Sequence, residues 1–158
     1  MIKRRMNFLS QQFNTTLPPN YDELKKAVNR TANWKERLAA VEELSKWKHK
    51  QTIDMLTHRM ENDPVYKVQL AAFDALQDFG LEVDMPTRKK FDLIKDASKT
   101  LVRIKKSLPH DHKFEDFKVK LQKMRVDIYD TYKGDKGEDF DQWLEDQWKS
   151  IPGRQARK

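Results

Sequence analysis

The chain reads Trp34-Lys35-Glu36-Arg37-Leu38-Ala39-Ala40-Val41-Glu42-Glu43-Leu44 and, 32 positions later, Tyr66-Lys67-Val68-Gln69-Leu70-Ala71-Ala72-Phe73-Asp74-Ala75-Leu76. Both stretches place apolar residues at the three- and four-residue spacing of an amphipathic helix. A pattern that recurs with a period of roughly 20 to 50 residues is typical of helical repeats, in which one helix pair stacks on the next and buries its apolar face. The sequence therefore predicts an all-α solenoid of stacked antiparallel helical hairpins.

The composition agrees with such a fold. Of the 158 residues, 37% are hydrophobic and 36% are charged, which suits helices that bury one stripe and solvate the rest. This length fits one domain, so we expect a single helical-repeat domain over 1–151 and a disordered basic tail over 152–158. Within it, we expect stacked helical hairpins over about 31–106 and additional C-terminal helices over about 110–150 that cap the stack.

The absence of cysteine from the sequence removes disulfides and thiolate chemistry from consideration. It favours a reducing compartment, and we expect a cytoplasmic protein. Because the sequence holds no apolar run of membrane-spanning length, we expect no integral membrane association. The formal net charge of +7 is concentrated in residues 1–30 and 81–108, which are compatible with anionic partners as well as with simple solvation.

The spacing of apolar and capping residues predicts where the helices lie. We expect the helix from about Trp34 to form one hairpin with the helix that follows it, and we expect Phe117, Leu121 and Met124 to share one apolar stripe. The expected helices cover about 2–13, 20–28, 34–48, 51–61, 64–79, 87–107, 114–133 and 140–148.

The stretch from Asp63 to Gly80 resembles the first helix of a bacterial HEAT repeat, of the type also called PBS-lyase HEAT-like. In that family an Asp-Pro pair opens the helix, a basic residue follows, small residues permit close helix contact and Gly ends the helix; the matching residues are Asp63-Pro64, Lys67, Ala71-Ala72 and Gly80. The resemblance covers about 31–106. It implies a curved stack whose concave side binds proteins or, in some DNA-repair relatives, duplex DNA, and it does not extend to lyase activity.

Basic residues recur along the expected helix over 87–107. They follow one another at steps of seven, four, four and three, which predicts a basic stripe opposite part of the apolar one. Phosphates of a nucleic acid could dock along this stripe. Alternatively it is a solvated face, with Asp92 and Asp96 paired to lysines three positions on. The stripe comprises Arg88, Lys95, Lys99, Arg103 and Lys106.

Aromatic residues form a second group of candidates. Trp34 and Tyr66 share one repeat position, which we expect early on the first helix of each hairpin, where they either pack within the scaffold or contact a partner. Trp143 and Trp148 lie near the C-terminus, where they either close the core or recognise a peptide.

The remaining polar groups predict no reaction. His110-Asp111-His112 is better explained by loop capping than by metal binding, and no catalytic, cofactor-binding or metal-ligating residue is expected. We therefore expect a non-enzymatic scaffold that binds another macromolecule. In such folds the partner is most often a protein. The alternatives are nucleic-acid binding through the basic stripe and, with less support, a DNA-base repair enzyme on a HEAT-like fold. The basic segment Lys3-Arg4-Arg5 either lies on a membrane surface or closes the end of the solenoid.

Overall fold

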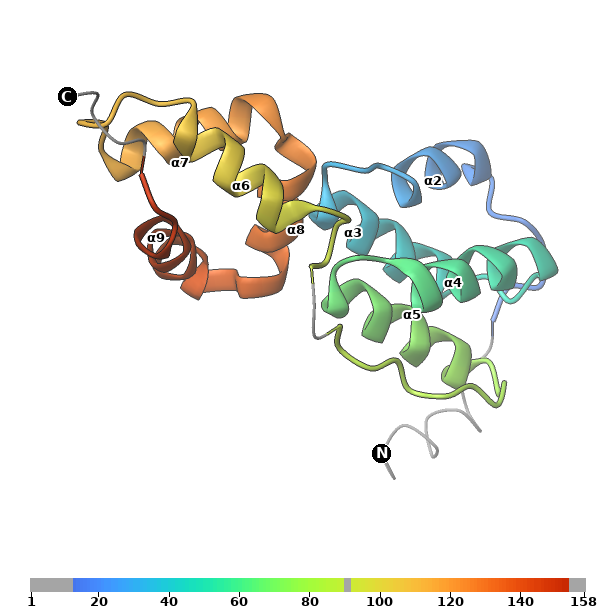
Figure 1. The fold of residues 1–158 in the computed structure, drawn as a ribbon. Coiled ribbons are helices and arrows are strands. Elements are labelled where there is room, and N and C mark those ends of the chain that lie inside the picture. The colour runs from blue at the N-terminus through green and yellow to red at the C-terminus, as the bar shows by residue number, and fades with distance from the viewer. Residues whose placement is uncertain (1–12, 90–91, 154–158) are drawn as a thin grey trace. The chain divides into compact units, whose positions relative to one another are not determined.

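The computed structural model describes residues 13–89 and 92–153. This part of the chain is helical and contains no strand, only an isolated bridge between Asn14 and Trp47. The predicted all-α fold is thus confirmed. The chain divides into two compact units, Met1–Arg88 and Lys89–Lys158, which run from blue to green and from yellow to red in Figure 1. Compactness does not show whether the units unfold together, so a single domain over 1–151 stays a prediction.

Two predicted segments fall outside this description. The expected helix over 2–13, with its basic residues, lies almost entirely outside the described residues, and so does most of the expected tail over 152–158. Phe13 itself is described, and its ring meets Phe79 edge-on with the ring centroids 4.8 Å apart. The chain at Asn14 exchanges two backbone hydrogen bonds with the loop that holds Trp47. The Phe13 ring and the Asn14 backbone therefore contact later parts of the first unit.

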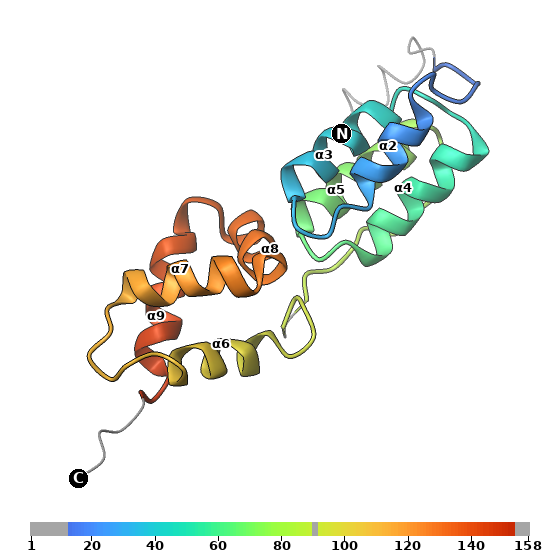
Figure 2. The same cartoon turned by 90° about the horizontal axis from the view of Figure 1, so that it is seen from above.

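The first unit consists of two helical hairpins. Helix α2 (Tyr21–Val28) packs on α3 (Trp34–Leu44), α4 (Lys50–Asn62) packs on α5 (Tyr66–Asp78), and α3 lies beside α5. Figure 2 shows the same four helices from above. Because α3 makes few contacts with α4, the predicted hairpin between the helices over 34–48 and 51–61 is wrong.

The repeat therefore begins one helix earlier than predicted. Leu24 and Leu56 are buried on α2 and α4, and so are Val28 and Met60, and the members of each pair are also 32 positions apart. The periodic pattern thus includes α2 and α4 as the first helices of the two hairpins. Helices α3 and α5, which carry the more visible sequence repeat, are the second helices.

A buried ion pair joins the two hairpins. Arg37 on α3 and Asp63, at the end of α4, are each 1% exposed. The Arg37 guanidinium donates to the Asp63 carboxylate from Nε at 2.9 Å and from Nη2 at 3.3 Å, and from Nη1 to the Arg30 carbonyl at 2.6 Å. Asp63 also accepts from Arg59 at 3.1 Å and from the Val65 backbone at 2.9 Å. The Asp63 carboxylate thus compensates the buried charge of Arg37, as burial requires.

The second unit contains α6 (Ala97–Lys106), α7 (Phe114–Met124), α8 (Val126–Lys136), a 3₁₀ turn (Gly137–Asp139) and α9 (Phe140–Ser150). The last helix confirms the expectation over 140–148. The core of the second unit is separate from that of the first unit and is built from one apolar stripe on each helix. The most deeply buried side chains of this core are Phe117, Leu121, Ile128 and Leu144.

The helix expected over 114–133 is broken into α7 and α8. Arg125 interrupts it with φ −139° and ψ 70°, and α8 continues beyond Gly134 to Lys136. The break turns the apolar stripe away from Met124, which is 60% exposed and not a core residue as predicted. Apolar spacing runs on through this position, so the pattern alone did not reveal the change of direction.

The helix expected over 87–107 begins only at Ala97. The described residues before it, 87–89 and 92–96, are not helical. Two local features explain why the helix starts late. The Asp92 carboxylate accepts from the Ser98 backbone at 2.9 Å and from the Ser98 hydroxyl at 2.6 Å, so it satisfies one of the first amides of α6. Asp96 has φ 62°, a left-handed conformation that an α-helix does not tolerate. The first half of the predicted helix is therefore wrong.

The start of α8 predicts a pH dependence of stability. Arg125 donates to Asp127 twice at 3.0 Å, and this hydrogen bonding, against the opposing effect of burial, lowers the pKa of Asp127. A carboxylate with a lowered folded-state pKa stabilises the fold above its unfolded-state pKa and loses that contribution as pH falls through the folded-state pKa.

We expect Asp127→Asn to lower the free energy of unfolding at neutral pH by at most about 1 kcal/mol, because the pair is partly solvated. The difference from wild type should shrink as urea denaturation is repeated at increasingly acidic pH. A difference that stays constant with pH would show that the Asp127 charge contributes nothing.

Candidate functional site

Cations cover both repeat-related aromatics in the first unit. The Lys67 ammonium lies 5.4 Å from the Trp34 ring centroid, and the Arg88 guanidinium lies 4.6 Å from that of Tyr66. The Tyr66 hydroxyl also donates to the Pro86 carbonyl at 2.8 Å. Both aromatics are half-buried and open the second helix of each hairpin, not the first as predicted. They contribute to packing and leave part of each ring at the surface.

The contact between Lys67 and Trp34 places the beginnings of α3 and α5 side by side. Residues at equivalent positions of the two helices, such as Lys35 and Lys67, therefore lie on one outer surface, which we call the paired face. Its members run from basic residues at the helix starts, through Leu and Ala, to acidic residues further on. Lys35, Ala39, Glu42 and Lys67 are exposed, and the others are half-buried. The paired face comprises Lys35, Leu38, Ala39 and Glu42 of α3 with Lys67, Leu70, Ala71 and Asp74 of α5.

The five residues of the predicted basic stripe do not share one helix. Arg88 belongs to the first unit, where it stacks on Tyr66, and Lys95 precedes α6. Lys99, Arg103 and Lys106 are exposed on α6 at steps of four and three, so they lie on one side of that helix. Lys99 approaches Asp96 at 3.9 Å, and both side chains are mostly solvated. The stripe is thus reduced to three residues.

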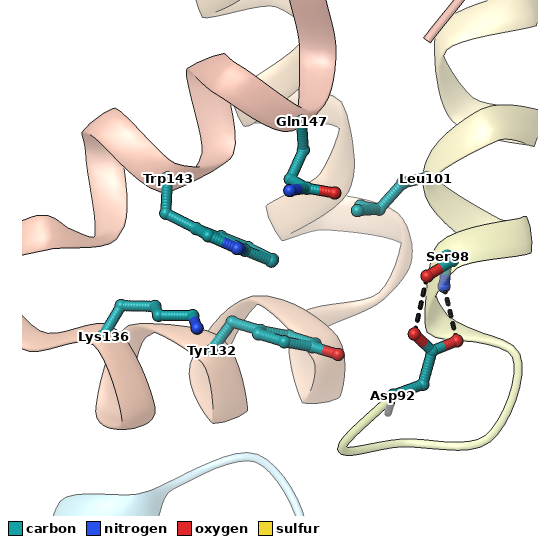
Figure 3. Close-up of a pocket in the computed structure, with 7 residues that line it drawn as sticks. All are labelled: Asp92, Ser98, Leu101, Tyr132, Lys136, Trp143 and Gln147. Carbon is teal, nitrogen blue, oxygen red and sulfur yellow. Dashed lines mark hydrogen bonds between the residues drawn. The ribbon is translucent and has the colours of Figure 1, made fainter. Parts of the chain in front are cut away.

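The second unit holds a cavity of about 530 Å³ between three helices, which we call the α6–α8–α9 cavity. Figure 3 shows side chains converging on it: Ser98 and Leu101 from α6, Tyr132 and Lys136 from α8, and Trp143 and Gln147 from α9, with Asp92 at the edge. The Tyr132 and Trp143 rings are stacked at 4.5 Å with an interplanar angle of 11°. The volume of the cavity, and its aromatic lining with a few polar groups, are typical of sites that bind small ligands.

The other C-terminal tryptophan has a structural role. The Trp148 indole Nε1 donates to His112 Nε2 at 2.8 Å, and His112 Nδ1 contacts the Pro109 carbonyl at 2.5 Å. The buried Lys105 ammonium donates to the Trp148 carbonyl and, at 2.5 Å, to that of Ile151, and burial lowers the pKa of Lys105. These bonds satisfy carbonyls at the end of α9. Trp148 therefore closes the core, whereas Trp143 lines the cavity.

Tyr132 and Gln147 were not predictable as site residues from the sequence. An aromatic and an amide on amphipathic helices do not mark a site by themselves. The residues around them in space are distant in sequence: the Tyr132 hydroxyl accepts a hydrogen bond at 3.1 Å from the backbone of Leu93, which is 39 positions away. The described residues bring no three His, Asp or Glu side chains together in a group that could hold a metal ion. None of the helices in residues 13–89 and 92–153 combines the length and apolar character needed to cross a bilayer.

Comparison with known protein families gives a match. The family described as HEAT repeats matches residues 21–104, more than half of the chain. The match begins at the first residue of α2, as expected if α2 and α3 form the first hairpin, and it ends within α6. No curated protein and no solved structure matches the chain.

Proposed function

Since this chain belongs to the HEAT-repeat family, we propose that it is a non-enzymatic scaffold that binds a protein partner through the paired face of α3 and α5. HEAT repeats commonly mediate protein interaction or scaffolding. Trp34 and Tyr66 border this face and are part of the proposed surface. A cytoplasmic location, inferred from the absence of cysteine, belongs to the same proposal.

The observation that carries this proposal is the duplication of surface residues. Core positions of a repeat recur because they pack, but Lys35 and Lys67 are both exposed and still recur at this offset, and the exposed Ala39 matches the half-buried Ala71. Small residues at the centre allow a partner backbone to approach closely, and the half-buried Leu38 and Leu70 provide apolar contact. The lysines favour acidic residues at one end of the partner segment, and Glu42 and Asp74 favour basic residues at the other.

The double variant Ala39→Arg/Ala71→Arg tests this surface. Bulky charged side chains at the centre should exclude the partner, and we expect at least a tenfold loss of the proteins that co-purify with wild type, measured by quantitative mass spectrometry. Because Ala71 is half-buried and packs against the core, thermal unfolding of the variant is measured alongside to show that it stays folded. A matched control is Asp54→Arg/Glu61→Arg, which changes exposed positions on α4. If wild type and Ala39→Arg/Ala71→Arg retain the same proteins in equal amounts, the paired face is not the binding surface.

A second candidate function is nucleic-acid binding, which the exposed position of Lys99, Arg103 and Lys106 on one side of α6 supports. The variant with all three residues changed to Glu should then lose most of its affinity for short DNA and RNA in fluorescence anisotropy. Binding by wild type should weaken steeply with salt because counterions are released from the phosphates. Absence of binding at low salt, or equal binding by the variant, would leave these residues as a solvated face.

A further inference from the structure

We propose that the α6–α8–α9 cavity binds a planar, uncharged heteroaromatic ring of the nucleobase type. The cavity lies wholly within the second unit and includes no residue of the paired face. The inference therefore does not rest on the proposed binding of a protein partner. Its volume of about 530 Å³ lies within the range of roughly 300 to 1,000 Å³ that holds small ligands.

The charges that line the cavity already have partners, which favours an uncharged ligand. Both oxygens of the Asp92 carboxylate accept hydrogen bonds from Ser98, at 2.9 and 2.6 Å. The Lys136 ammonium lies 3.5 Å from Asp135 and 5.3 Å from the Trp143 ring centroid. A charged ligand would have to compete with these contacts as well as lose its own hydration.

Two neutral hydrogen-bonding groups remain for a ligand. Tyr132 is 7% exposed, and its hydroxyl oxygen accepts from the Leu93 backbone at 3.1 Å, but the described residues offer no hydrogen-bond acceptor to its proton. A tyrosine hydroxyl is protonated at neutral pH, and burial raises the pKa of Tyr132 further. The Gln147 side-chain amide, which makes no hydrogen bond with the described residues, faces the cavity in Figure 3. It supplies both a donor and an acceptor.

The shape of the lining favours a flat ring. The nearly parallel Trp143 and Tyr132 rings point into the cavity, and Leu101 lies across from them on α6 (Figure 3). Aromatic and apolar walls favour a π-surface, while an amide with a donor and an acceptor side by side matches the edge of a nucleobase. A ring that offers adjacent donor and acceptor groups therefore satisfies both the walls and Gln147.

The test is a titration of the full-length, ¹⁵N-labelled chain with adenosine, followed by NMR. Adenosine carries no phosphate, so it probes the cavity without involving the basic residues of α6. We expect saturable shifts of the Trp143 indole and the Gln147 amide signals, with the Trp34 and Trp47 signals of the first unit unchanged. Ribose alone should produce no shift.

Variants distinguish binding in the cavity from binding elsewhere. Gln147→Leu and Tyr132→Phe should each weaken adenosine binding about tenfold, which is the effect of losing hydrogen bonds worth roughly 1.4 kcal/mol. The control Gln142→Leu changes another glutamine of α9 that is exposed and bonded to Asp146 at 2.9 Å, and it should bind like wild type. A variant with Lys99, Arg103 and Lys106 changed to Glu should also bind like wild type.

Three results would overturn the inference. The first is that adenosine causes no saturable shift at its solubility limit. The second is that Gln147→Leu and Gln142→Leu bind equally well. The third is that N-acetyl-phenylalanine amide shifts the same signals while adenosine does not, which would assign the cavity to a side chain of a protein partner. Thermal unfolding of each variant, compared with wild type, shows whether a loss of binding comes from loss of the fold.

Discussion

Replacing Asp63 by Ala is expected to lower the free energy of unfolding by about 3–5 kcal/mol, the usual cost of removing one partner from a buried ion pair. The change leaves the Arg37 guanidinium, 1% exposed, without the carboxylate that it contacts at 2.9 and 3.3 Å. It also removes the acceptor for the Val65 backbone and for Arg59. Urea denaturation followed by circular dichroism measures the loss.

A double-mutant cycle separates the unpaired charge from other effects. Arg37→Met/Asp63→Ala removes both members of the pair, and it should be less destabilising than the sum of the single changes. Arg30→Ala is the control for loss of an exposed arginine, whose side chain is 60% exposed and 3.7 Å from Glu36, and it should change stability very little. A loss of less than about 1 kcal/mol in Asp63→Ala would contradict the view that this pair holds the hairpins together.

Replacing Phe117 by Ala is expected to cost about 3–5 kcal/mol of stability, in the second unit. Phe117 is fully buried in the core formed by α6 to α9, and its removal would create a cavity that neighbouring side chains fill only in part. The matched control is Val119→Ala on the same helix, because Val119 is 46% exposed. Denaturation curves for the two variants should differ strongly. Equal stability would mean that α7 does not bury the side predicted by its apolar spacing.

Much of the fold could be predicted from the sequence. The repeated pattern around Leu44 and Leu76 identified helices with a period of 32 residues, and the spacing after Pro109 identified further helices. Their pairing was wrong because α2 and α4 repeat less visibly: only a few positions, such as Leu24 and Leu56, match between them. A periodic pattern gives the length of a repeat but not the helix at which it begins.

Single local contacts account for the other differences in the fold. Apolar spacing ran through residues 92–96 and through Arg125 without interruption. There, the Asp92 carboxylate holds the start of α6, and Asp96 adopts a left-handed conformation. The double hydrogen bond between Arg125 and Asp127 marks the start of α8. Charged side chains at helix starts are common in any sequence, so these particular ones carried no distinctive signal.

The candidate sites were less predictable because they depend on contacts between distant residues. Arg37 meets Asp63 across 26 positions, and the α6–α8–α9 cavity combines residues from Asp92 to Gln147. By contrast, the shared repeat position of Trp34 and Tyr66 was visible in the sequence and led to the paired face. Internal repetition therefore revealed one surface, whereas the cavity required the tertiary structure.

The most direct test of the proposed scaffold function is site-specific photo-crosslinking in cells with a benzophenone amino acid at Ala39. The same probe at Asp54, exposed on α4, is the matched control. A partner bound to the paired face should give a discrete crosslinked protein from position 39 that is absent from position 54, and the crosslink should disappear when Ala71 is changed to Arg. A crosslinking pattern that is the same at both positions, or no crosslink at position 39, would contradict binding through α3 and α5.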